Sequence, residues 1–86
     1  MNKLAADMNI GDNLRQLRKK HKFTQDRLVA KLELLEINIT RSLYSRYETG
    51  ELNIPISVLV ALHEIYHCSY DDFFQGLKVT TDGNTQ

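Results

Sequence analysis

Residues 39–50 of this chain read ITRSLYSRYETG, and they contain the signals for both ends of a helix. Thr40 is a residue type that is preferred at the N-cap, where its hydroxyl accepts a hydrogen bond from a backbone N–H of the first turn. Gly50 suits the position just after a helix, because glycine adopts a left-handed φ without a Cβ penalty. The stretch therefore predicts a short helix over about residues 41–49.

The two sides of this helix differ in chemistry. At about 100° per residue, Tyr44 and Tyr47 fall on one side together with Thr40. The opposite side and its flanks combine arginine, hydroxyl and leucine side chains, which can contact guanine, either base-pair partner and the thymine methyl group, respectively. The candidates for base contacts are Arg41, Ser42, Leu43, Ser45 and Arg46. An ordinary amphipathic helix with a solvated face fits the same pattern.

Two further features favour an anionic partner for this helix. Its outward face carries no acidic residue, so a wall of phosphates could approach without repulsion. Arg41 lies in the first turn, where a cation opposes the helix dipole at a cost of a few tenths of a kcal/mol. That cost is understandable if the arginine reaches outward to an anion.

Two helices are predicted before this segment. Apolar residues at positions 10, 14 and 17 have the i, i+4, i+7 spacing of one buried stripe, which predicts a helix from Asn9 to about His21. Thr24 is the N-cap candidate of the next helix, which ends near Leu35. The connection to residue 40 is long, and we expect Leu34, Leu35, Ile37 and Ile39 to fill it.

Two helices are also predicted after Gly50. Pro55 is compatible with the first turn of a helix that is apolar on nearly two sides through residue 66. Ser69 can cap a last short helix, whose Phe73 and Phe74 are expected to fold onto the core. With no strand pattern and no repeat, the chain is predicted to be all-α. We expect a compact five-helix domain over residues 9–77, a flexible arm over 1–8 and a disordered tail over 78–86.

Length and composition exclude several classes of protein. The chain has 86 residues, which is enough for one small core. No stretch approaches the roughly 20 apolar residues that a membrane span needs, and the first nine residues have no apolar signal core, so a cytoplasmic location is expected. Cys68 is the single cysteine, which excludes an intramolecular disulfide and a four-cysteine metal site.

The net charge of zero hides a strong asymmetry. Residues 1–46 carry a net charge of +5, and residues 47–86 carry −5. Such a division suggests one basic working face and one acidic half. A cluster of lysines that merely solvates the end of a helix is the alternative explanation.

Several blocks of the sequence, taken in order, resemble the phage-repressor family of helix-turn-helix domains, the Cro/CI or XRE type, which is found in bacteria and phages. After the opening Ile10–Gly11, these blocks are LRQLRK at 14–19, FTQDRL at 23–28, ITRSLYSRYETG at 39–50 and CSYDDFF at 68–74. The resemblance covers about residues 9–76. It implies a lambda-repressor-like fold and a transcription regulator, expected to be a repressor, that places the helix at about 41–48 in the major groove of double-stranded DNA.

The resemblance also implies roles for residues outside that helix. Gln25, which opens the second helix, is expected to contact the DNA backbone, and Arg18 and Glu48 are expected to form a structural ion pair. The phosphate-contacting candidates are Thr24, Gln25, Thr49 and Asn53. Relatives of this type often form homodimers through their last helices, so a homodimer is expected here.

The sequence also departs from the family pattern. The stretch between Gln25 and Thr40 is longer than the shortest turns of the family, and the loop after Gly50 lacks the basic residues of many relatives. His63 stands where a small alanine is usual. We interpret it as a half-buried core histidine, with a pH-sensing or ligand role as the alternative.

Two other function classes compete with DNA binding. An enzyme or metal site would need convergent groups, and His63, His67 and Cys68 do not supply them, so neither catalysis nor a metal or other cofactor is expected. A protein–protein adaptor, or an antitoxin that grips a toxin, remains the alternative. Its partner surface would use the acidic half and the aromatic end of the chain, and a regulatory protein or peptide could bind there.

Overall fold

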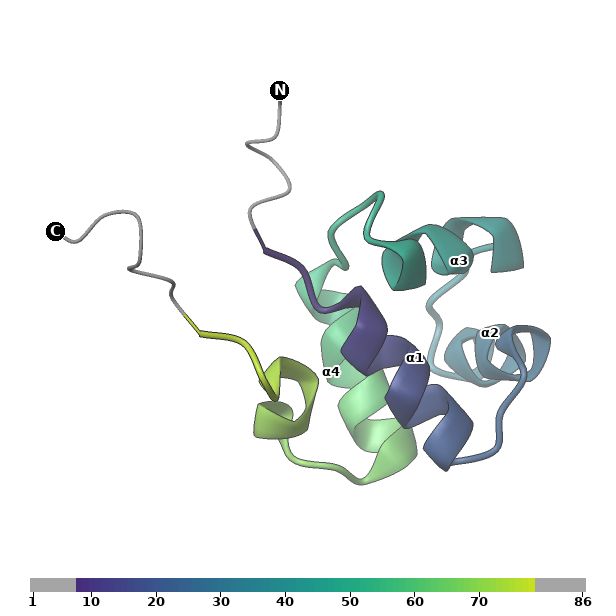
Figure 1. The fold of residues 1–86 in the computed structure, drawn as a ribbon. Helices are drawn as coiled ribbons and strands as arrows, with labels where there is room; N and C mark the ends of the chain where they lie inside the picture. Colours follow the sequence, from purple (N-terminus) through teal and green to yellow (C-terminus); the bar gives the residue numbers. More distant parts are fainter. Residues whose placement is uncertain (1–7, 79–86) are drawn as a thin grey trace, which may run out of the picture.

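The computed structural model describes residues 8–78, which form four α-helices and one short 3₁₀ helix, with no strand in that range (Figure 1). The elements are α1 (Gly11–Lys20), α2 (Gln25–Leu34), α3 (Arg41–Thr49), α4 (Ile56–Tyr66) and η2 (Tyr70–Phe74). The all-helical class is confirmed. The expectation of five helices is wrong in its last member, which is a single 3₁₀ segment. Residues 1–7 and 79–86, which include most of the predicted arm and tail, lie outside the described range.

The predicted caps of the two central helices are confirmed. Thr24 Oγ1 accepts a hydrogen bond of 3.1 Å from the Arg27 backbone N–H, and Thr40 Oγ1 accepts one of 3.0 Å from Leu43. Gly50 ends α3 in the left-handed region at φ 85°. Each cap satisfies a backbone group that the helix leaves without an internal partner, so these three residues determine where α2 begins and where α3 begins and ends.

The short η2 helix explains why one predicted core residue is at the surface. Ser69 and Asp72 form a capping box at its start. Phe73 is fully buried, whereas Phe74 is 48% exposed, so the expectation that both would fold onto the core is wrong for Phe74. Because a 3₁₀ helix turns by 120° per residue, the side chain that follows the buried Phe73 points well away from it.

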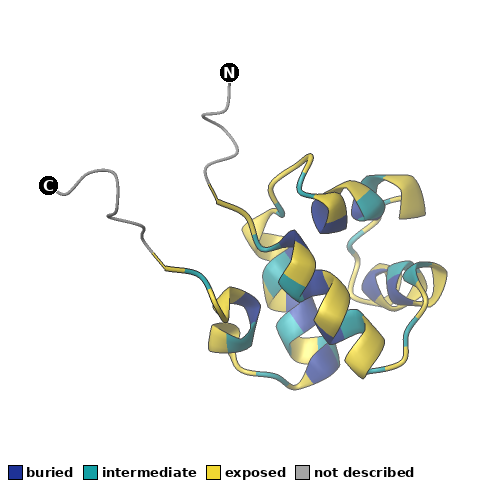
Figure 2. Ribbon diagram, viewed as in Figure 1, coloured by how far each residue is buried: buried dark blue, intermediate teal, exposed yellow. Residues whose placement is uncertain are grey.

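One hydrophobic core joins all five elements (Figure 2). Its largest fully buried side chains come from every helix: Leu14, Leu28, Leu32, Tyr44, Leu62 and Phe73. Tyr44 and Tyr47 supply the buried side of α3, and their rings pack edge to face with centroids 6.1 Å apart. The aromatic side of α3 is therefore anchored, and its other side is turned away from the core.

Of the four apolar residues expected to fill the connection between α2 and α3, two pack against the core and two are exposed. Ile37 and Ile39 are partly buried against the core. Leu34 and Leu35 are 78% and 42% exposed, so the expectation that they fill the connection is wrong. Glu36 adopts φ 64°, and this left-handed residue turns the chain so that Ile37 rather than Leu35 reaches the core.

The helices are all short. None of those within residues 8–78 has the length and apolar character that a membrane crossing requires.

Candidate nucleic-acid interface

The outward side of α3 gathers the side chains that the sequence singles out for base contacts. Arg41, Ser42 and Arg46 are exposed, and Leu43 and Ser45 are partly exposed at its edges. Thr49 is exposed at the C-terminal end. Opposite them, Tyr44, Tyr47 and Glu48 are buried, so the helix presents one polar strip to solvent and cannot rotate without losing its core contacts.

The helix α3 lies against α1 and α2 (Figure 1). A close approach to α1 occurs at Gly11, where a Cβ atom would come within 2.8 Å of the Tyr47 carbonyl oxygen and closer still to that of Glu48. Only a glycine allows the first turn of α1 to touch the end of α3 in this way. The contact therefore helps to set how α3 is held on the domain.

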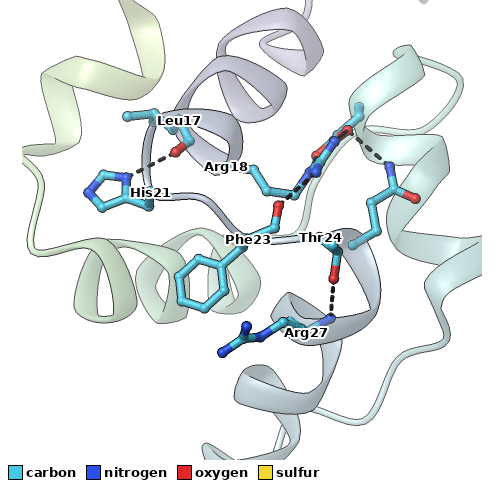
Figure 3. Close-up of polar contacts among 8 residues, drawn as sticks. Leu17, Arg18, His21, Phe23, Thr24 and Arg27 are labelled. Atoms are coloured by element: carbon cyan, nitrogen blue, oxygen red, sulfur yellow. Dashed lines mark hydrogen bonds and ion pairs between the residues drawn. The ribbon is translucent and has the colours of Figure 1, made fainter.

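A buried ion pair joins α1 to α3. Arg18 Nε donates to Glu48 Oε2 at 2.7 Å and Arg18 Nη2 donates to Glu48 Oε1 at 3.1 Å, a bidentate arrangement. Arg18 Nη1 also donates to the Phe23 carbonyl oxygen at 2.9 Å (Figure 3). Both charged side chains are largely buried, at 12% and 4% exposure. The pair thus connects α1, the turn before α2, and α3.

Gln25 belongs to the same network. Its Nε2 donates to Glu48 Oε1 at 3.0 Å, so the side chain expected to contact the DNA backbone is turned toward α3. Burial opposes ionisation of Glu48, but hydrogen bonds from Arg18 and Gln25, helped by the Arg18 charge, outweigh it and lower the pKa of Glu48. The hydrogen bond with Glu48 correspondingly raises the pKa of Arg18. Both groups are therefore charged at neutral pH.

The other predicted phosphate contacts are spread over the domain. The Thr24 hydroxyl accepts the cap of α2 (Figure 3). The Thr49 hydroxyl donates to the Arg46 carbonyl oxygen at 3.2 Å and accepts from the Glu51 N–H at 3.4 Å. Asn53 lies beyond the end of α3 and lines a hollow of about 240 Å³ together with Asn9. The structure thus places Thr24 and Gln25 at the start of α2, Thr49 at the end of α3 and Asn53 in the loop after α3.

Two acidic residues that sequence reasoning missed lie beside the arginines of α3. Arg41 Nε is 3.3 Å from Asp26 Oδ1, which comes from α2. Arg46 Nε is 3.3 Å from Glu51 Oε1, which comes from the loop after α3. Asp26 is separated from Arg41 by the whole α2–α3 connection, so no spacing in the sequence indicates the pair. The face of α3 itself has no acid, but two acids border it.

The histidines and the cysteine do not converge. The ring of His63 stacks on that of Tyr70, with centroids 4.0 Å apart, and His63 is half-buried as expected. His67 is the left-handed C-cap of α4 at φ 55°. Burial raises the pKa of the Cys68 thiol. Among residues 8–78, no three histidine, cysteine or acidic side chains are grouped so as to hold a metal ion.

Comparisons with known proteins agree with this arrangement. Of curated proteins, the uncharacterized HTH-type transcriptional regulator YobD of Bacillus subtilis (strain 168) is 41% identical over 58 residues, which is 67% of this chain and 47% of that protein. The chain thus spans about half the length of the curated relative. No solved structure matches significantly. The Helix-turn-helix family model matches residues 14–73, which is most of the described domain. The resemblance found in the sequence is thereby confirmed: the chain belongs to the Helix-turn-helix family.

Proposed function

We propose that this protein binds double-stranded DNA sequence-specifically and regulates transcription, with α3 lying in the major groove. The observation that carries the proposal is the division of α3, whose aromatic side is locked into the core while Arg41, Ser42 and Arg46 face solvent. A helix of this size fits the major groove of B-DNA. The family membership and the name of the relative in Bacillus subtilis support the same function.

The base contacts in this proposal come from α3 and the phosphate contacts from its surroundings. The base-reading residues are Arg41, Ser42, Leu43, Ser45 and Arg46. Phosphates would meet Thr24 and the start of α2, where backbone N–H groups and the positive end of the helix dipole favour an anion. Gln25 at the start of α2, Thr49 at the end of α3, and Asn53 would complete these contacts.

A two-fold homodimer suits the exposed apolar residues of the C-terminal half. Ile56 and Val60 on α4 are 77% and 38% exposed, and Tyr70 and Phe74 on η2 are 43% and 48% exposed. A second copy that covered these side chains would bring two α3 helices to successive major grooves, about 34 Å apart. We infer that the protein acts as a repressor, because a dimer bound over an operator blocks the access of other proteins to that DNA.

Fluorescence anisotropy tests the proposed function. Binding to the DNA upstream of its own gene is compared with binding to a scrambled duplex over a salt series. Specific binding that weakens steeply with salt is expected, because contacts to phosphates release counterions. Arg41→Ala should weaken the free energy of DNA binding by about 1–3 kcal/mol and reduce the preference for one base at a single base pair. If the wild-type protein binds neither duplex at low salt, the proposed function is wrong.

One observation favours a protein partner as the second candidate function. A hollow of about 320 Å³ lies between the ends of α2 and α4. Its apolar lining residues are Phe23, Leu34, Leu35 and Ile65, of which Leu34 is 78% exposed, and its polar lining residues are Lys31, Glu64 and His67. An adaptor or antitoxin would use such an apolar surface. Substituting Arg41 and Arg46 by alanine would then leave partner binding intact, whereas it should abolish DNA binding.

A further inference from the structure

Each of the two exposed arginines of α3 lies beside one acid, and the two acids come from different parts of the chain. In each ion pair the nearest nitrogen is Nε, at 3.3 Å from a carboxylate oxygen of Asp26 or Glu51. All four side chains are well exposed, from 59% to 80%. Exposed pairs of this kind contribute little to stability, because water competes with them and ordering two long side chains costs entropy. Stability therefore does not explain why an acid lies beside each arginine.

The choice of Nε determines which edge of each guanidinium remains available. The group is planar and offers its five N–H donors in a fixed fork. Because Nε is the nitrogen nearest to the carboxylate in both pairs, the end edge formed by Nη1 and Nη2 lies further from the acid. The end edge can donate two parallel hydrogen bonds to guanine O6 and N7. The acids thus leave open the edge that a guanine would use.

The acids also oppose the main competitor of a guanine, which is a phosphate. Water screens pairs that are this exposed, so a carboxylate at 3.3 Å offsets a part of the arginine's charge and weakens its attraction for a phosphate. A base edge carries no net charge, so its attraction to the arginine is weakened less. An arginine beside an acid therefore discriminates between a base edge and the DNA backbone better than an unpaired arginine does.

We propose that Asp26 and Glu51 are positioning residues that orient Arg41 and Arg46 to read two guanines in the DNA site. This inference rests on the proposed function and assigns a base to each arginine. The arginines are five positions apart, or about 7.5 Å along the helix axis, which corresponds to roughly two base-pair steps. The two guanines are accordingly separated by only a few base pairs within one half-site.

The test is a selection of bound duplexes from a random-sequence library, carried out with the full chain. Arg41→Ala and Arg46→Ala first identify which selected position belongs to which arginine. Asp26→Asn and Glu51→Gln then remove one carboxylate charge each with little change in shape. Asp71→Asn is the matched control, because it makes the same charge change on exposed η2, away from α3 (Figure 1). Thermal melting of every variant shows that it is folded.

The expected result is a crossed pattern. Asp26→Asn should lower the preference for guanine over adenine by about fivefold or more at the Arg41 position alone, a part of the discrimination that a bidentate contact provides. Glu51→Gln should do the same at the Arg46 position alone, and both variants should bind scrambled DNA more tightly. Asp26→Glu, which keeps the carboxylate, should restore the preference.

Four outcomes would overturn the inference. The guanine preferences could survive in Asp26→Asn and Glu51→Gln, or they could fall equally in Asp71→Asn, which would make the effect one of net charge. The wild-type protein could enrich a site without guanine at the arginine positions. If the wild-type protein enriches no sequence at all, the proposed function itself fails, and the inference fails with it.

Discussion

The Glu48 carboxylate forms the ion pair that links α3 to α1. Its carboxylate is 4% exposed and accepts hydrogen bonds from Arg18 and Gln25. The bidentate bond to a buried guanidinium is much stronger than an exposed pair, because little water competes with it. A single substitution at this position therefore tests how much of the stability depends on the network.

Glu48→Gln should destabilise the domain by about 3 kcal/mol, because the charge of Arg18 is left buried without its partner. Urea unfolding followed by circular dichroism measures the free energy. The matched control is Asp12→Asn, which breaks the exposed pair between Asp12 and Arg15 at 3.1 Å and should change the stability little. Equal effects of the two substitutions would show that burial does not determine the value of these pairs.

The pH dependence of stability should report the same carboxylate. The pKa of Glu48 is lower in the folded protein than in the unfolded chain, where it is about 4.3. Its contribution is therefore fully present above about pH 4.3 and is lost as the pH falls through the lower, folded value. The stability difference between the wild-type protein and Glu48→Gln should narrow from pH 7 to about pH 3 in urea titrations. A difference that stays constant would contradict the assigned shift.

The packing of α1 on α3 should make a glycine-to-alanine substitution in α1 destabilising. Replacing glycine by alanine inside a helix usually stabilises it by about 0.5–1 kcal/mol. Gly11→Ala should instead destabilise the domain by about 1–3 kcal/mol, because the added methyl group would overlap the carbonyl oxygens of Tyr47 and Glu48. The displaced α3 should also bind DNA more weakly.

Calorimetric melting and the anisotropy assay measure the two effects of Gly11→Ala. Gln16→Ala is a control on the exposed side of α1 and should leave both quantities close to wild type. If Gly11→Ala raises the melting temperature, the close approach of the two helices is not a constraint on the fold.

Oligomeric state is decided by the surface of the domain. If a homodimer covers the C-terminal apolar residues, Val60→Lys should convert it to a monomer, because a buried unpaired charge is costly. DNA affinity for a two-fold site should fall with it, since two linked modules bind more tightly than one. Sedimentation velocity measures the mass, and Leu34→Lys at the other apolar surface is the control. A dimer that survives Val60→Lys but not Leu34→Lys would place the interface at α2.

The sequence alone was sufficient to predict the features that depend on residues close together in the chain. The Thr24 and Thr40 caps, the glycine stop at residue 50 and the buried and exposed sides of α3 follow from hydrogen-bonding capacity, φ preference and helical periodicity. These are local properties, so the type and place of the central helices and the candidate base-reading residues could be predicted without a structure.

Only the tertiary structure decided which side chains meet across elements. It places Asp26 beside Arg41, Glu51 beside Arg46 and Gln25 on Glu48, and it exposes Leu34 and Phe74, which the apolar pattern assigned to the interior. Such contacts depend on how helices pack and on how a left-handed turn or a 3₁₀ segment rotates the chain. Asp26 and Arg41 are 15 positions apart, and an ion pair between distant positions leaves no periodic trace. Glu51 follows Arg46 by five positions, but it belongs to a loop, whose geometry helical periodicity does not describe.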